Sequence, residues 1–175
     1  MLTSLDRKLI GWSAAFVVSQ TLVAKVLGPT APRVLEVQTA WSAPRYRKVL
    51  ASMDDADIVR YRSHYYLDMI HPAIFGVALF IGGRRLGQIT ELSPVTRAAL
   101  AAAPIVAASG DYVENFVGLH LLDHSEDITD TTVRTTSAIS TVKWVLALGT
   151  FGYLSQGYVR TWGRMLRRKL TRRPA

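Results

Sequence analysis

Four long, predominantly apolar runs constrain what this chain can fold into. They cover residues 9–27, 63–81, 96–122 and 133–158. Each run is long enough to cross a bilayer as an α-helix, which needs about 20 residues with few charges. The pattern predicts an all-α, polytopic membrane protein: a bundle of four transmembrane helices in a single membrane domain covering residues 1–175, with residues 159–175 as a basic cytoplasmic tail.

The distribution of charge indicates an orientation for this bundle. The 175 residues include 21 Lys+Arg and 13 Asp+Glu, which gives a formal net charge of +8. If the N-terminus lies inside, the inner flanks carry 12 of the Lys and Arg residues and the outer loops carry seven, as the positive-inside rule favours. We therefore expect a multi-pass protein of the bacterial inner (plasma) membrane with both termini cytoplasmic. Nucleic acid is not needed to explain the basicity, because orientation explains it.

The first outer loop, residues 29–60, contains a helical pattern. Tyr46, Val49, Leu50 and Met53 recur at the spacing of one helix face, which predicts a short amphipathic helix. This helix either lies on the outer membrane surface as a lid or packs on the ends of the bundle, and the sequence leaves both arrangements open.

Local signals predict where the spans begin and end. Ser52, with Asp55 three residues later, is expected to cap the start of the second span. Ser93 followed by Pro94 is expected to begin the third. Asp130 or Thr131 is expected to cap the fourth, and Gly82-Gly83 to end the second.

Polar residues gather at one depth, in the outer part of the predicted spans. The inner halves contain no ionisable side chain. Asp111, Glu114 and Asn115 share one face of their helix, because residues three and four apart are neighbours there. Pro72 is expected to kink the second helix and to free the backbone carbonyl of Asp68. The residues of this layer are Gln20, His64, Asp68, His71, Asp111, Glu114, Asn115, His120 and Lys143.

The charges of this layer do not balance, since three carboxylates face one deep cation, Lys143. A dry site cannot hold that imbalance, so a carboxyl is protonated, His71 is charged, or a bound cation or water compensates. Asp68, Asp111 and Glu114 are therefore candidate catalytic residues. The same cluster is also typical of a structural hydrogen-bond network. No metal-ligand spacing and no cofactor-binding motif occurs, and the chain has no Cys for a disulfide, a Cys-ligated metal or a thiol nucleophile.

The segments VLEVQTAWSAPRYRKVL, YYLDMIHPAIFGVALF, GDYVENFVG and TVKWVLAL together resemble a family of uncharacterised bacterial four-span membrane proteins with an LDxxxP … DxxEN … K pattern. The resemblance covers residues 34–148 and implies an architecture and a candidate site, but no activity. It adds Gln38 and Trp41 to His71, Asn115 and Lys143 as candidate binding residues. The matching positions are Gln38, Trp41, Ser42, Asp68, Pro72, Asp111, Glu114, Asn115 and Lys143.

These features predict a pocket, open to the outer leaflet, that binds a small amphiphile or lipid with or without acid–base chemistry on it. The alternative is a non-enzymatic accessory or assembly subunit that contacts a membrane-protein partner. An ion- or proton-coupled transporter is disfavoured, because the polar layer does not continue through the inner halves and no inverted repeat occurs.

Overall fold

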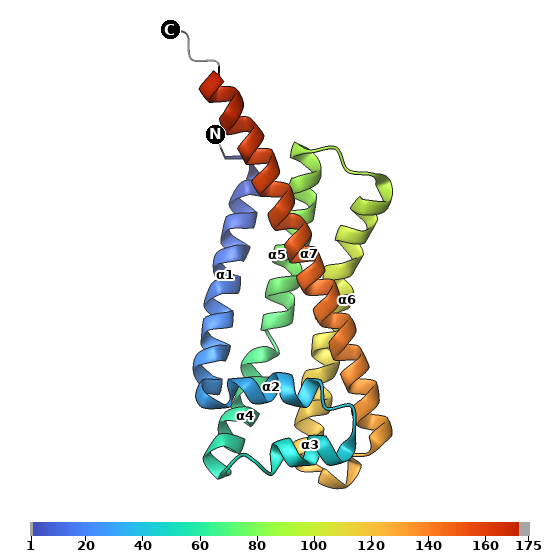
Figure 1. Ribbon diagram of the computed structural model, residues 1–175. Helices are drawn as coiled ribbons and strands as arrows, with labels where there is room; N and C mark the ends of the chain where they lie inside the picture. Colours follow the sequence, from blue (N-terminus) through green and yellow to red (C-terminus); the bar gives the residue numbers. More distant parts are fainter. Residues whose placement is uncertain (1, 172–175) are drawn as a thin grey trace.

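The computed structural model describes residues 2–171, and side chains over residues 2–167. The fold is all-α, with no strand in the described part of the chain. Figure 1 shows α1, α5, α6 and α7 running alongside one another. The helix α1 packs against α5, α5 against α6, and α6 against α7. The elements are α1 (Ser4–Leu27), η1 (Gly28–Thr30), α2 (Ala31–Gln38), α3 (Ala43–Leu50), α4 (Asp55–Asp68), α5 (His71–Ile89), α6 (Pro94–Asp123), η2 (Ser125–Asp127) and α7 (Asp130–Thr171).

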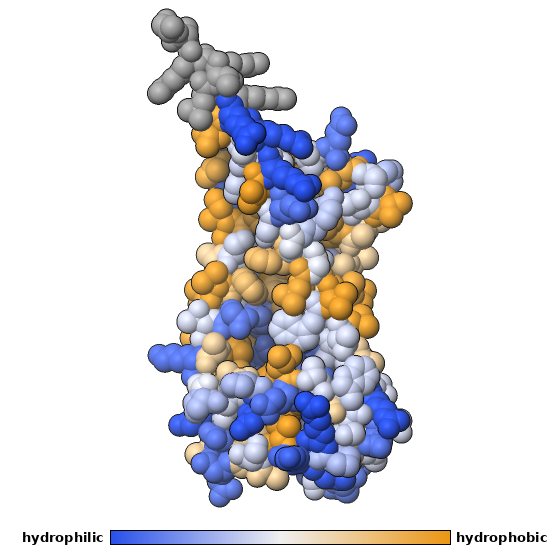
Figure 2. Space-filling view, in the orientation of Figure 1, coloured by the Kyte–Doolittle hydropathy of each residue, from blue (hydrophilic) through white to orange (hydrophobic). Residues whose placement is uncertain are grey.

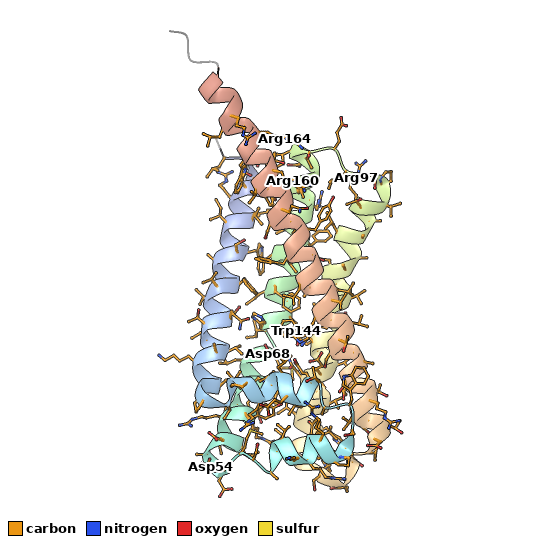
Figure 3. All side chains as sticks on the ribbon, viewed as in Figure 1. Asp54, Asp68, Arg97, Trp144, Arg160 and Arg164 are labelled. Atoms are coloured by element: carbon orange, nitrogen blue, oxygen red, sulfur yellow. The ribbon has the colours of Figure 1, made fainter. Side chains whose placement is uncertain are left out.

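The two ends of the molecule differ. The short helices α2 and α3 cross one end, which we call the α2–α3 end, while α1 begins and α7 finishes at the opposite end (Figure 1). Arg97, Arg160 and Arg164 gather at that opposite end, which we call the basic end, and Asp54 lies at the α2–α3 end (Figure 3).

Helix caps confirm one of the predicted boundaries and correct two. Ser93 caps α6 by accepting the N–H of Thr96, as predicted. Asp54 rather than Ser52 caps α4, because the Ser52 hydroxyl donates to the Val49 carbonyl instead.

Thr129 caps α7 by accepting the N–H of Thr132 at 3.1 Å. The two predicted cap residues, Asp130 and Thr131, are instead the first two residues of the helix. The Asp130 carboxylate accepts the N–H of Ala43 at 2.8 Å. The start of α7 is therefore tied to the start of α3.

The predicted kink at Pro72 is confirmed. The helices α4 and α5 meet at an angle of 45°, with Pro72 in the first turn of α5. The prediction that Gly82-Gly83 ends this helix is wrong, because α5 continues to Ile89. Both glycines are buried, and a Cβ at Gly83 would lie 3.1 Å from the Leu100 Cβ. These glycines allow α5 to approach its neighbours closely rather than stopping it.

The predicted amphipathic helix is confirmed as α3. Its face of Tyr46 and Val49, with the following Met53, is buried in a hydrophobic core. This core also includes Val23 of α1 and Tyr61 of α4. The helix therefore packs on the ends of the long helices, which is the second of the two arrangements considered. The preceding helix α2 was not expected.

Apolar side chains cover the middle of the long helices. Figure 2 shows hydrophobic residues gathered there and hydrophilic residues over the two ends. Val17, Phe116 and Val145 are 61%, 64% and 65% exposed, although Lys143 is 5% exposed. At the level of Lys143 the molecule thus exposes apolar side chains and buries charged ones.

Within the described residues, one helical stretch, Ser4–Gln38, is long and apolar enough to cross a membrane, and the bent pair α4–α5 makes a second if it is counted as one span. The helices α6 and α7 carry Asp111, Glu114 and Lys143, and these charges lower their mean hydropathy.

Candidate functional site

Lys143 of α7 lies at the centre of a buried charge cluster against α6. Its Nζ donates to Asp111 Oδ1 at 2.9 Å and to Glu114 Oε2 at 2.8 Å. All three residues are buried, with Asp111 5% and Glu114 7% exposed. The two carboxylates reach the same ammonium because they are one turn apart on the same face of α6.

Gln38 and Trp144 connect this cluster to the surface. The Gln38 side chain donates from Nε2 to Glu114 Oε2 at 2.6 Å and accepts at Oε1 from Trp144 Nε1 at 2.9 Å. Trp144 is 39% exposed, and its ring also lies 5.0 Å from Lys143 Nζ. Gln38 is the last residue of α2, so the position of α2 decides how the cluster is covered.

One oxygen of the cluster has no hydrogen-bond partner within the part of the chain that the structure describes. Glu114 Oε1 is buried without a hydrogen bond to any described residue. A buried polar atom left unpaired costs about 1–3 kcal/mol, and more for a charged group. This atom therefore marks the place where the cluster can take up a proton, or can accept a hydrogen bond from the hydroxyl or amine of a bound molecule.

Asp68 lies beside the cluster, at the break between α4 and α5. Asn115 Nδ2 donates to the backbone carbonyl of Asp68 at 2.9 Å, which is the acceptor that Pro72 leaves free. The half-buried carboxyl of Asp68 is within electrostatic reach of Asp111 and Lys143. Two carboxylates thus bind one ammonium and a third carboxyl lies nearby, so the site as a whole favours a bound group that brings positive charge or hydrogen-bond donors.

The other two predicted binding residues lie at the edge of this arrangement. His71 forms a hydrogen bond between Nδ1 and Ser19 Oγ at 2.9 Å, and its ring packs against Phe16 and Phe75. It joins α1 to α5. Trp41 is 47% exposed and has a φ of 56°. Its backbone N–H donates to Ser137 Oγ at 3.3 Å, which ties the α2–α3 turn to α7.

The sequence did not indicate the roles of Trp144 or of an aromatic group beneath α3. In the aromatic group, Tyr65 Oη donates to Tyr61 Oη at 3.2 Å, and the His64 ring packs against both tyrosines. The spacing of these residues at i, i+3 and i+4 was a usable signal, because it puts them on one face of α4.

An ion pair holds the long helices together at each end. Arg62 donates to both oxygens of Asp123 at 2.5 and 2.9 Å, and these hydrogen bonds lower the pKa of that exposed carboxyl. At the basic end, Arg85 Nε donates to Asp6 Oδ1 at 2.5 Å. Hydrogen bonds from Thr3 lower the pKa of Asp6.

Burial also raises the pKa of Tyr46, in α3, to about 12. Its phenol is therefore neutral at physiological pH and belongs to the core beneath α3.

Over the described residues, no group of three His, Asp or Glu side chains is placed to hold a metal ion. No protein-family model, curated protein or solved structure matches this chain.

Proposed function

We propose that this chain is an integral membrane protein of four spans, made by α1, the bent pair α4–α5, α6 and α7. The apolar side chains exposed over the middle of the long helices support this proposal, because soluble proteins rarely expose large apolar patches. Ionisable residues inside a membrane usually face the bundle interior and one another, as Lys143, Asp111 and Glu114 do. By the positive-inside rule the basic end faces the cytoplasm of the bacterial inner membrane.

We further propose that the buried cluster binds the polar head of a small amphiphile or lipid at the depth of the outer leaflet. The unpaired Glu114 Oε1 is the observation that carries this proposal. An amine or hydroxyl in the ligand would supply the missing donor, and an amine would also offset the excess of carboxylates. The ligand would pass Gln38 and Trp144, since these two side chains separate the cluster from the surface.

The same groups provide acid–base chemistry on the bound head. Lys143 compensates Asp111 and one oxygen of Glu114, while the Asp68 carboxyl and Glu114 Oε1 remain to exchange a proton with the ligand. Positioned carboxyl groups that give and take protons are the usual general acids and bases of such reactions.

Ligand retention tests the proposal. The protein would be purified in mild detergent from its native membrane, and bound molecules counted by native mass spectrometry. Glu114→Gln should lower the occupancy of the bound amphiphile about tenfold or more, because it changes the oxygen that the ligand contacts. Glu126→Gln is the matched control, since Glu126 is exposed at the same end. Equal occupancy in both variants would refute the proposal.

A folding control separates binding from a structural role. Asp68→Asn should also lower ligand occupancy, while the helical circular dichroism and the thermal midpoint stay close to those of the unsubstituted protein. If Glu114→Gln and Asp68→Asn both unfold the protein, the cluster is structural.

The second candidate function, an accessory subunit of a membrane complex, is favoured by the α2–α3 turn. Trp41 holds a φ of 56°, which is strained for a bulky residue. Its side chain and Leu35, 56% exposed, present apolar surface at this end. Co-purification of one stoichiometric partner that is lost in Trp41→Ala and kept in Glu114→Gln would favour this function over ligand binding.

A further inference from the structure

A cavity of about 160 Å³ opens at the basic end, far from the charge cluster. It lies between the end of α5, the connection from α5 to α6, and α7. Arg160, Arg164 and Gln156 line it from α7, and Thr90 and Glu91 line it from the connection. A shallower depression of about 580 Å³ shares Thr90 and Glu91 with it and is bounded by Arg97.

Three arginines around the two depressions form no ion pair with the side chains that the structure describes. Over residues 2–167, no ion pair joins a carboxylate to Arg97, Arg160 or Arg164, whereas the nearby Arg85 is bound to Asp6. Figure 3 shows the three arginines around the same end of the bundle. Glu91 also has no ion pair within the described side chains, so the group around the two depressions carries a net positive charge.

The size and the donors suit a phosphate group. A water molecule takes about 30 Å³ in the liquid, so the cavity holds roughly five groups of that size. This is room for a phosphate with a short substituent. The planar guanidinium of arginine bonds phosphate oxygens in pairs, and Arg160 and Arg164 are one turn apart on α7. Glu91 can accept a hydrogen bond from an ammonium or hydroxyl beyond the phosphate.

We propose that this cavity binds the phosphodiester head group of a phospholipid. Arg160 and Arg164 contact the phosphate oxygens, and Glu91 contacts the amine or hydroxyl of the head group. The binding of a phosphate group is inferred from the cavity alone. That this phosphate belongs to a lipid rests on the proposed membrane insertion. Tyr153 of α7, which lines the cavity and is 43% exposed, provides a surface for the acyl chains and favours a lipid over a soluble phosphate ester.

Binding by the full chain in detergent tests this. Delipidated protein would be titrated with phosphatidylethanolamine or with water-soluble glycerophosphoethanolamine, and occupancy read by native mass spectrometry. The double variant Arg160→Gln/Arg164→Gln should weaken lipid binding about tenfold or more, given roughly 1 kcal/mol for each basic residue at a membrane surface. The matched control is Arg45→Gln/Arg47→Gln, which removes the same charge from exposed positions on α3.

The outcomes separate the alternatives. Equal lipid binding by both double variants would refute the cavity as the site. Equal binding of the lipid and the soluble ester would overturn the lipid as the source. Glu91→Gln should narrow the preference for phosphatidylethanolamine over phosphatidylcholine, whose head group has no N–H, and an unchanged preference would refute the role of Glu91. Because both arginine double variants keep Glu114, any lipid held at the charge cluster contributes equally to both, so failure here is distinct from failure of the proposed function.

Discussion

Replacing Lys143 by methionine removes the ammonium group that lies between Asp111 and Glu114 and keeps most of the side-chain volume. Both carboxylates then lose a hydrogen bond of less than 3 Å. Neither can turn to water, because Asp111 is 5% and Glu114 7% exposed. The substitution therefore leaves buried negative charge uncompensated.

The cost of this change follows from that burial. Removing one partner of a buried ion pair costs about 3–5 kcal/mol. For a chain of this size each kcal/mol shifts the thermal midpoint by about 2–4 °C. We expect Lys143→Met to lower the midpoint by about 6–20 °C.

Thermal unfolding in detergent, followed by circular dichroism, measures this shift. Lys25→Met is the matched control, since Lys25 is exposed on α1 and its loss should change the midpoint little. The compensated variant Asp111→Asn/Glu114→Gln/Lys143→Met should recover most of the loss, because no uncompensated charge remains among these three positions. A midpoint for Lys143→Met equal to that of Lys25→Met would refute the buried cluster as a source of stability.

Two further predictions concern a helix contact and a surface ion pair. Gly118→Ala would push a Cβ into the side chain of Tyr65 and should destabilise the fold by about 1–3 kcal/mol. Gly152→Ala is the control, because nothing lies within 4 Å of that position, and it should be neutral or stabilising by up to about 1 kcal/mol. Equal thermal midpoints for the two variants would contradict the close packing of Gly118 against Tyr65. Asp123→Asn removes a carboxyl whose pKa is lowered by Arg62. A carboxyl with a lowered pKa in the folded state contributes stability at neutral pH. That contribution is lost as the pH falls through the lowered pKa, below about 4. The midpoints of Asp123→Asn and the unsubstituted protein, compared across pH, should converge in acid, and a gap independent of pH would contradict the ion pair.

Helical spacing predicted much of the candidate site. Asp111, Glu114 and Asn115 were placed on one face because local geometry sets which residues of a helix are neighbours, and Pro72 predicted the free carbonyl of Asp68. Depth along the predicted spans placed Lys143 at the same level. These inferences needed only the rise and periodicity of a helix.

Tertiary contacts decided the features that the sequence did not predict. A Gly-Gly pair is typical of a helix end, but Gly82 and Gly83 lie within α5, where they allow close packing against neighbouring helices. Asp54 caps α4 in place of Ser52, because the Ser52 hydroxyl donates to the Val49 carbonyl instead. The contact between Gln38 and Trp144 joins residues 106 positions apart, and no local pattern encodes such a pair.

The four-span arrangement is tested most directly by the accessibility of single cysteines, and the chain has no native Cys to interfere. Three positions sample the two ends and the middle: Ala51, Val95 and Val145, all exposed. In right-side-out spheroplasts, a membrane-impermeant maleimide should label Ala51→Cys at once and Val95→Cys only after permeabilisation. Val145→Cys should stay unlabelled until detergent and denaturant are added, because lipid covers it. Rapid labelling of Val145→Cys by the aqueous reagent in intact spheroplasts would contradict the membrane arrangement.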